Sequence, residues 1–154
     1  VETVSRPVHA RYGLEVPSRI YLAEKRMARL HDHDLIHRAG VAEIRHQLGA
    51  PADPNAWEVE ARGRLRYEEP DAVWRSVLGE IAIEYDTGSY TMKAVDKKVE
   101  TFRDRAFIQT IWGTTSDSRA ARLSEVLGPQ GVQVMTAKWW QQQQPTEQKT
   151  GVSA

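Results

Sequence analysis

The sequence predicts an α/β domain with a mixed five-stranded sheet and helices on both faces. Apolar and polar residues alternate after residue 55, as they do in half-buried strands. From residue 80 onward, strand-like segments alternate with helix-like segments. The first three strands have short connections and predict an antiparallel meander. The later strand–helix–strand–helix–strand order predicts parallel neighbours joined by right-handed crossovers.

Composition limits the classes of protein that fit. The 154 residues suit one domain with tails. Because 21 Lys and Arg balance 21 Asp and Glu, a polybasic coat is excluded, and a nucleic-acid surface must be a local patch. The absence of cysteine excludes disulfides, cysteine zinc sites and thiol nucleophiles. No apolar run reaches the ~20 residues of a membrane span, and no secretory signal is visible, which favours a cytoplasmic protein.

The first third of the chain is predicted to be an arm followed by helices. Residues 1–16 hold few apolar positions without a clear period, which indicates an N-terminal arm. Pro17-Ser18 opens a helical stretch that extends to about Leu48. The polar run at residues 31–34 and Gly40 indicate a break, so two helices are expected, the second from about Asp34 to Leu48.

The predicted domain spans residues 17–140, and the polar tail at 141–154 is predicted to be disordered. Its strands are expected at 57–67, 72–74, 80–86, 106–112 and 132–139, and its later helices at 90–105 and about 117–127. Alternation in the third strand places Ile81 and Ile83 on one face, and Glu84 and Asp86 on the other. The predicted core comprises Ile81, Ile83, Val95, Val99, Phe102, Ile108, Leu123 and Val134.

Three acidic residues form a candidate metal site. If the strands at 72–74 and 80–86 pair as a hairpin, Asp71 approaches Glu84, with Asp86 further along the same strand. Carboxylates held together repel each other unless a cation lies between them, and hard oxygen ligands suit Mg²⁺ or Mn²⁺. Such an ion polarises a phosphodiester and activates water. Lys93 and Lys97 on the next helix are then placed to approach a phosphate.

This arrangement resembles the PD-(D/E)xK nuclease core. Pro70-Asp71, then Glu84-Tyr85-Asp86, then a helix carrying Lys93 follow the order of that core, as do the surrounding elements. The resemblance implies a restriction-endonuclease-like fold and a Mg²⁺-dependent deoxyribonuclease. Asp71 and Glu84 would hold the metal, and Asp71, Glu84, Asp86 and Lys93 would be the catalytic set. The motif places Asp86 where a lysine is expected, so Lys93 or Lys97 would replace that lysine.

A narrower resemblance points to one family. The runs at 37–45, 70–73 and 83–89 are similar to the C-terminal part of the replication-relaxation family, and the likeness covers roughly residues 20–138. Members are carried on bacterial plasmids and integrative elements, and they normally have a winged helix-turn-helix before this domain. This chain is too short to hold one. The resemblance implies a DNA-processing or DNA-binding protein.

Two interpretations of the acidic residues stay open. In an active nuclease, Asp71 and Glu84 converge below an open groove and bind the metal. In a non-catalytic module that binds DNA or a protein partner, the same residues point apart or are sealed by Arg or Lys. Zero net charge favours the second interpretation slightly. His37, with Glu43 and His46, either faces this site or belongs to an ordinary polar helix face.

Basic residues near the N-terminus form a candidate DNA-contacting face. Lys and Arg cluster on the first predicted helix, where they could contact phosphates, although Glu24 lies among them. The same pattern is typical of a solvated helix. The predicted DNA-binding residues are Arg19, Lys25, Arg26, Arg29 and Lys97.

Overall fold

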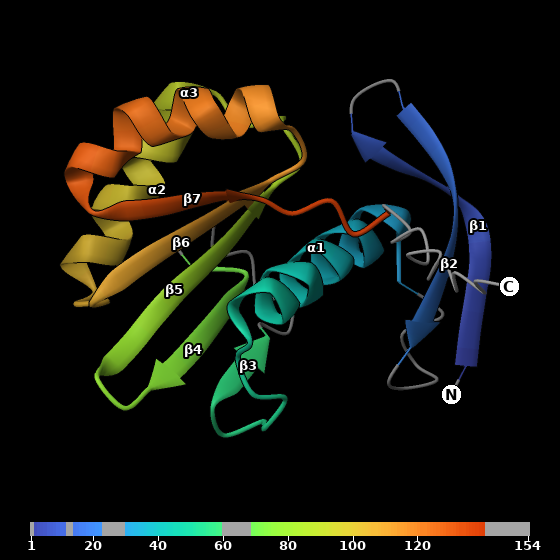
Figure 1. Cartoon of the computed structure of the whole chain (residues 1–154), viewed down its shortest axis with the longest axis horizontal. Helices are drawn as coiled ribbons and strands as arrows, with labels where there is room; N and C mark the ends of the chain where they lie inside the picture. Colours follow the sequence, from blue (N-terminus) through green and yellow to red (C-terminus); the bar gives the residue numbers. More distant parts are fainter. Residues whose placement is uncertain (1, 12–13, 23–29, 60–68, 141–154) are drawn as a thin grey trace, which may run out of the picture.

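The computed structural model describes residues 2–11, 14–22, 30–59 and 69–140 of the chain. Seven strands, three α-helices and one short 3-10 helix lie in these ranges (Figure 1). In chain order they are β1 (Glu2–Arg11), β2 (Leu14–Leu22), α1 (Asp32–Leu48), β3 (Trp57–Val59), β4 (Ala72–Ser76), β5 (Gly79–Asp86), α2 (Met92–Asp104), β6 (Gln109–Thr114), α3 (Asp117–Leu127), η2 (Gly128–Gln130) and β7 (Val132–Thr136).

The predicted mixed five-stranded sheet is confirmed. Its strand order is β3-β4-β5-β6-β7. The first three strands pair antiparallel, whereas β5, β6 and β7 pair parallel, so β5 lies in the centre where the strand direction changes. Helix α1 covers one face of the sheet, and α2 and α3 cover the other (Figure 1).

Two apolar clusters, one on each face, form the core. On one face, α1 packs against β5 through contacts that include Ile44, Ile83 and Tyr85. On the other face, Val99 of α2 and Leu123 of α3 pack against Trp112. The predicted core position Ile108 is wrong, because its side chain is 53% exposed. Strand β6 pairs with β5 from Gln109 onward, so Ile108 precedes the covered part of the sheet. Val134 is only partly buried.

The N-terminal region is a β-hairpin. Strands β1 and β2 pair antiparallel as a separate two-stranded sheet, from Glu2 opposite Leu22 to Arg11 opposite Leu14. The helix expected to begin at Pro17 is therefore wrong over residues 17–22, and residues 2–11 of the expected arm are a strand. Val4, Val8, Val16 and Ile20 are β-branched and favour strands, but their separations of four and eight residues give no period of two. The predicted tail at 141–154 lies outside the described residues.

Helix α1 is continuous through Gly40, which confirms the expected helix from about Asp34 to Leu48 and shows that the glycine itself marks no break. A Cβ atom at Gly40 would lie 2.4 Å from ring carbons of Tyr85, a buried residue of β5. The glycine is therefore needed for a close approach of helix to sheet and does not end the helix. Gly113 of β6 serves the same contact, because its Cβ would lie 2.4 Å from Ile44 Cδ1.

We expect Gly40→Ala to destabilise the protein even though alanine favours helices. Alanine improves helix propensity by about 1 kcal/mol, but overpacking against the Tyr85 ring costs about 1–3 kcal/mol, so we expect a net loss of about 1 kcal/mol. Urea unfolding measures this change. Gly128→Ala is the matched control, since nothing lies within 4 Å of its Cβ position. A Gly40→Ala protein as stable as the native one would contradict the close approach.

Candidate functional site at three buried carboxylates

The three acidic residues selected from the sequence are buried near the middle of the sheet. Glu84 and Asp86 lie in the second half of β5 and are 0% exposed, and Asp71 precedes β4 directly and is 8% exposed. Strand β5 has neighbours on both sides and helices on both faces. Each carboxylate is therefore removed from water, and its partners within the protein decide its chemistry.

Asp71 bonds to the backbone of β5 just beyond the end of the β4 pairing. That pairing ends at Ala72 opposite Ile83, and the preceding Pro70 has no N–H to donate to a further ladder bond. Beyond this point the Asp71 carboxylate accepts a hydrogen bond of 2.8 Å from the backbone N–H of Tyr85. Its Oδ2 atom also lies 3.4 Å from Nδ1 of His37 on α1. The Pro70-Asp71 pair thus terminates the strand pairing and connects β5 to α1.

Glu84 lies against α2 and its preceding loop. Its Oε1 atom accepts hydrogen bonds from Lys98 Nζ at 2.5 Å and from the Tyr90 hydroxyl at 3.2 Å. The Lys98 ammonium also lies 5.3 Å from the centre of the Tyr90 ring, within the range of a cation–π contact. The Oε2 atom is buried and has no hydrogen-bond partner among the described residues.

The surroundings of Glu84 favour its neutral form. Burial, reinforced by the negative charge of Asp71, raises the pKa of the Glu84 carboxyl from 4.5 to about 8, although Lys98 and Tyr90 act in the opposite direction. Between these two values the folded protein holds a proton that the unfolded chain releases. Stability contributed by Glu84 is therefore complete below pH 4.5 and falls as the pH rises toward 8.

We expect Glu84→Gln to remove this fall in stability. Glutamine has nearly the shape of the protonated carboxyl and does not titrate, so the variant should melt close to the native protein at pH 5 and above it at pH 9. The melting temperature measured across this pH range gives the result. Glu125→Gln, an exposed change on α3, is the control and should leave the native profile intact. Identical profiles for native and Glu84→Gln protein would contradict the raised pKa.

Asp86 is held by α3. Its Oδ2 atom accepts hydrogen bonds from Arg119 Nε at 2.8 Å and from Arg119 Nη2, and its Oδ1 atom accepts one from the N–H of Gly88 at 2.7 Å. Arg119 Nη2 also donates to the Tyr90 carbonyl at 2.8 Å. This buried ion pair fixes the end of β5, the following loop and the start of α3 in one arrangement.

The replication-relaxation family model matches residues 7–117, which is most of the chain. The chain belongs to the replication-relaxation family. No curated protein and no solved structure shows significant similarity to it.

Family membership confirms the narrower resemblance and indicates a role in the replication or relaxation of a plasmid or mobile element. The matched segment includes most of the hairpin, together with α1 and the carboxylates of Asp71, Glu84 and Asp86. The hairpin is therefore part of the replication-relaxation unit, although the sequence patterns placed an arm there. Arg119 lies two residues beyond the matched segment.

The basic residues predicted near the site are arranged differently from the expectation. Lys93 and Lys97 are exposed on α2, and the lysine that contacts Glu84 is Lys98. Arg19 lies in β2 opposite Ser5, so it does not belong to a helix. The other predicted DNA-binding residues of this region, Lys25, Arg26 and Arg29, lie outside the described residues.

Lys98 and Arg119 were missed, although the sequence contains a signal for each. Lys98 lies within the apolar stripe of α2, three residues after Val95 and four before Phe102, and Arg119 lies four residues before Leu123 on α3. A basic residue within an apolar helical stripe is buried only at a cost unless it is paired, so it points to an acidic partner on the facing sheet.

The described residues contain no group of three or more His, Asp and Glu side chains arranged to hold a metal ion. The three carboxylates predicted to share one cation have separate partners instead. Asp71 contacts the Tyr85 N–H and His37, Glu84 contacts Lys98, and Asp86 contacts Arg119. None of the helices in the described residues has the length and apolar character of a membrane span.

Proposed function

We propose that this chain is a non-catalytic, DNA-binding module that acts in the replication or relaxation of a plasmid or mobile element. The observation that supports the non-catalytic role is the pairing of every candidate acid with a group of the protein itself. In a working metal centre, carboxylate oxygens are open to the ion, and the ion in turn contacts the phosphate. Here Lys98 occupies one oxygen of Glu84 and Arg119 occupies one oxygen of Asp86, and this supports the sealed arrangement expected of a non-catalytic domain.

The distribution of charge along the chain supports DNA binding. Residues 1–29 hold six Lys and Arg against three Asp and Glu, whereas residues 30–154 hold 15 against 18. The neutral chain therefore has a basic N-terminal region and an acidic remainder. Two-stranded antiparallel ribbons fit the major groove of duplex DNA, and β1 and β2 form such a ribbon. We propose that this region contacts DNA phosphates, with Arg19, Lys25, Arg26 and Arg29 among the contacts and Lys97 of α2 as a further one.

The salt dependence of DNA binding tests this proposal. Fluorescence anisotropy with labelled duplex and single-stranded oligonucleotides gives the affinity at several salt concentrations. Each lost phosphate contact lowers the slope of log K against log salt by about one, so Lys25→Gln/Arg26→Gln should lower it by about two, and Lys97→Gln by about one. Arg103→Gln/Arg122→Gln removes the same charge from exposed positions on α2 and α3 and is the control. The proposal would be contradicted if the two double variants lowered the salt slope equally, or if the native chain did not bind DNA.

Metal-dependent DNA hydrolysis is the second candidate, and Glu84 is the observation that favours it. One oxygen of this buried carboxylate lacks a hydrogen-bond partner among the described residues, and the other lies 2.5 Å from a lysine ammonium. Mg²⁺ or Mn²⁺ would be held by Glu84 and Asp71, with Lys98 in place of Lys93 beside the phosphate. When bound, the ion would supply an activated water and stabilise the charge that develops on the phosphate. Because the pKa of Glu84 is about 8, metal binding would release a proton.

Calorimetry with Mn²⁺ above pH 8, together with nicking of supercoiled DNA, separates the two candidates. A nuclease binds the ion and nicks DNA, and Asp71→Asn, Glu84→Gln and Lys98→Met each abolish nicking. Asp117→Asn removes an exposed carboxylate and is the control. The non-catalytic module binds DNA in the anisotropy assay but gives no Mn²⁺ heat at millimolar metal and no nicking.

A further inference from the structure

The three parallel strands of the sheet end in one row of residues. Asp86, Thr114 and Thr136 are aligned at the carboxyl ends of β5, β6 and β7, in that order. Helices α2 and α3 both begin shortly after this edge (Figure 1). In open α/β sheets, ligands bind outside the carboxyl ends of the parallel strands. This edge is therefore the part of the fold where a ligand is expected.

The hydroxyl of Thr114 lacks a partner at this edge. Thr114 is 0% exposed, and its Oγ1 atom has no hydrogen-bond partner among the described residues. Paired residues of parallel strands point to the same face of a sheet, and the neighbour Asp86 binds Arg119 in the first turn of α3. The Thr114 hydroxyl is therefore aimed at the start of α3. Burying a hydroxyl without a partner costs free energy, which a ligand at this place would recover.

The start of α3 offers backbone donors as well. Ser116 Oγ accepts a hydrogen bond from the N–H of Arg119 at 3.3 Å. The N–H groups of Asp117 and Ser118 come before the first intrahelical bond, which the N–H of Ala120 donates at 2.9 Å. Each helix N-terminus carries about half a positive charge and is suited to anions such as phosphate. Helix α2 begins at the same edge and has no acidic residue in its first turn.

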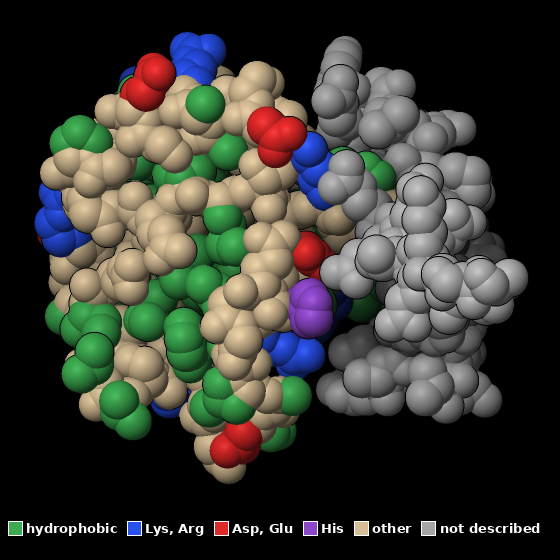
Figure 2. Space-filling view, viewed as in Figure 1, with side chains coloured by type: hydrophobic (Ala, Val, Ile, Leu, Met, Phe, Trp, Pro, Cys, Tyr) green, Lys and Arg blue, Asp and Glu red, His purple; other side chains and the backbone are tan. Residues whose placement is uncertain are grey.

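Two ion pairs leave this edge neutral before the helix ends are counted. Asp86 is paired with Arg119, and Asp117 Oδ2 lies 2.6 Å from Lys138 Nζ. Hydrogen bonds from Lys138 and Thr136 lower the pKa of the Asp117 carboxyl. Acidic and basic side chains lie side by side where α3 begins (Figure 2). The Asp117 side chain is 76% exposed and is able to turn into water, so the two helix ends would leave the edge positive.

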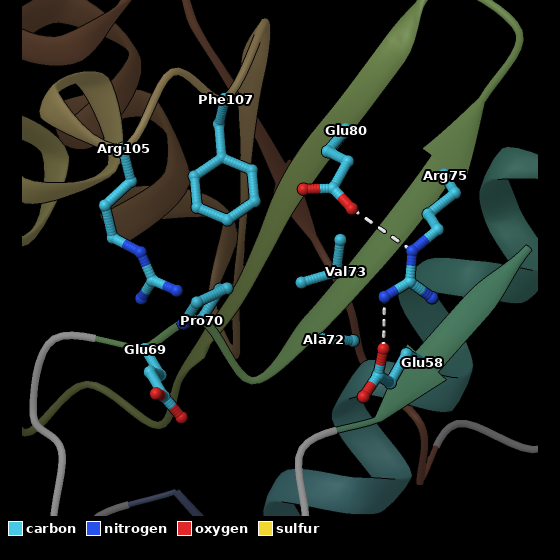
Figure 3. Close-up of a pocket in the computed structure, with 9 residues that line it drawn as sticks. All are labelled: Glu58, Glu69, Pro70, Ala72, Val73, Arg75, Glu80, Arg105 and Phe107. Atoms are coloured by element: carbon cyan, nitrogen blue, oxygen red, sulfur yellow. Dashed lines mark hydrogen bonds and ion pairs between the residues drawn. The ribbon is translucent and has the colours of Figure 1, made fainter.

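The cavity beside β4 has the opposite balance of charge. It has a volume of about 260 Å³ and is lined in part by charged residues (Figure 3). Arg75 forms ion pairs with Glu58 and Glu80 there, and Glu69 and Arg105 complete the charged part of the lining. Three carboxylates therefore outnumber two guanidinium groups, which disfavours an anion in this cavity. The carboxyl edge of the parallel strands is the better place for one.

We propose that the edge formed by the ends of β6 and β7 and the start of α3 binds a phosphate group. Lys138 leaves Asp117 and pairs with the phosphate, whose oxygens accept hydrogen bonds from the N–H groups of Asp117 and Ser118. The Thr114 hydroxyl donates a further one. In the free protein, the Asp117 carboxylate takes the place of this anion. The site stands apart from DNA binding by the N-terminal region, because free phosphate is enough to test it.

Calorimetry of the full chain with inorganic phosphate at millimolar concentrations tests the proposal, with chloride as the reference anion. The native chain should bind phosphate weakly, since Asp117 competes for Lys138. Asp117→Asn should tighten binding by about fivefold because it removes the competing charge, whereas Lys138→Met should weaken it by about tenfold. Arg122→Met removes a positive charge from an exposed position on the same helix and should bind phosphate like the native chain.

A second variant separates a ligand contact from a structural role. Thr114→Val keeps the shape of the buried side chain and removes only its hydroxyl. Because that hydroxyl has no partner among the described residues, the variant should melt at or above the native temperature, yet bind phosphate about threefold more weakly. The proposal is overturned if the native chain and Asp117→Asn give no heat with phosphate. It is overturned as well if Asp117→Asn and Thr114→Val both bind phosphate as the native chain does.

Two oligonucleotides distinguish the sources of the phosphate. A single strand with a 5′-phosphate should bind more tightly than the same strand with a 5′-hydroxyl if the site takes the end of a DNA strand, and Lys138→Met should remove the difference. Equal affinities, together with phosphate binding in calorimetry, would support the site and assign it to a free phosphate compound. Loss of phosphate binding would leave the salt dependence of DNA binding by the N-terminal region unchanged, so the two proposals fail separately.

Discussion

Replacing Arg119 by methionine is expected to lower the free energy of unfolding by about 3–5 kcal/mol, the cost of leaving one buried charge without its partner. The Asp86 carboxylate is 0% exposed, and Arg119 provides two of its three hydrogen bonds. In the variant only the Gly88 N–H would remain. The Tyr90 carbonyl would lose its hydrogen bond from Arg119 as well.

Urea unfolding at neutral pH measures this loss, and two further variants define its origin. Arg122→Met removes an exposed arginine from the same helix and should change stability by less than about 0.5 kcal/mol. Asp86→Asn combined with Arg119→Met removes both charges and should recover part of the loss, because no buried ion is left unpaired. A loss below about 1 kcal/mol in Arg119→Met would show that water reaches Asp86.

Val99→Asp is expected to leave the domain largely unfolded at room temperature. Val99 is 3% exposed and packs in the cluster that joins α2 and α3 to the sheet. A carboxylate at this position has no cation of its own, so burying it costs several kcal/mol against a typical domain stability of about 5–15 kcal/mol.

Far-ultraviolet circular dichroism and urea unfolding report the outcome for Val99→Asp. The same change at Val126, which is 43% exposed on α3, is the control and should keep the native spectrum. If Val99→Asp retained the native unfolding midpoint, the helix face assigned to the core would be incorrect.

The two faces of the sheet could be predicted because β5 alternates strictly. Ile81 and Ile83 fall on the α1 side, and Glu84 contacts α2, as the spacing of two requires. The parallel part of the sheet followed from the strand–helix order, and the family from the short runs around residues 70–73 and 83–89.

The partners of the acids could not be predicted from local patterns. Arg119 lies 33 residues from Asp86, and Lys98 lies 14 residues from Glu84, so each pair depends on how a helix docks on the sheet. The hairpin was missed for another reason. Its two strands pair with each other in a separate sheet, and their few apolar positions have no clear period of two, so the sequence signal is weak.

Each helix of the domain reaches the second half of β5 through a buried polar contact. His37 of α1 contacts Asp71, which accepts the Tyr85 N–H, while Lys98 of α2 binds Glu84 and Arg119 of α3 binds Asp86. No helix can detach alone without exposing or unpairing one of these carboxylates. Partial opening therefore costs nearly as much as complete unfolding, and amide hydrogens in β5 and the three helices should exchange with solvent as one cooperative unit. The β1–β2 hairpin forms its backbone hydrogen bonds in a separate sheet and supplies none of these carboxylate contacts, so we expect its amides to exchange separately from that unit.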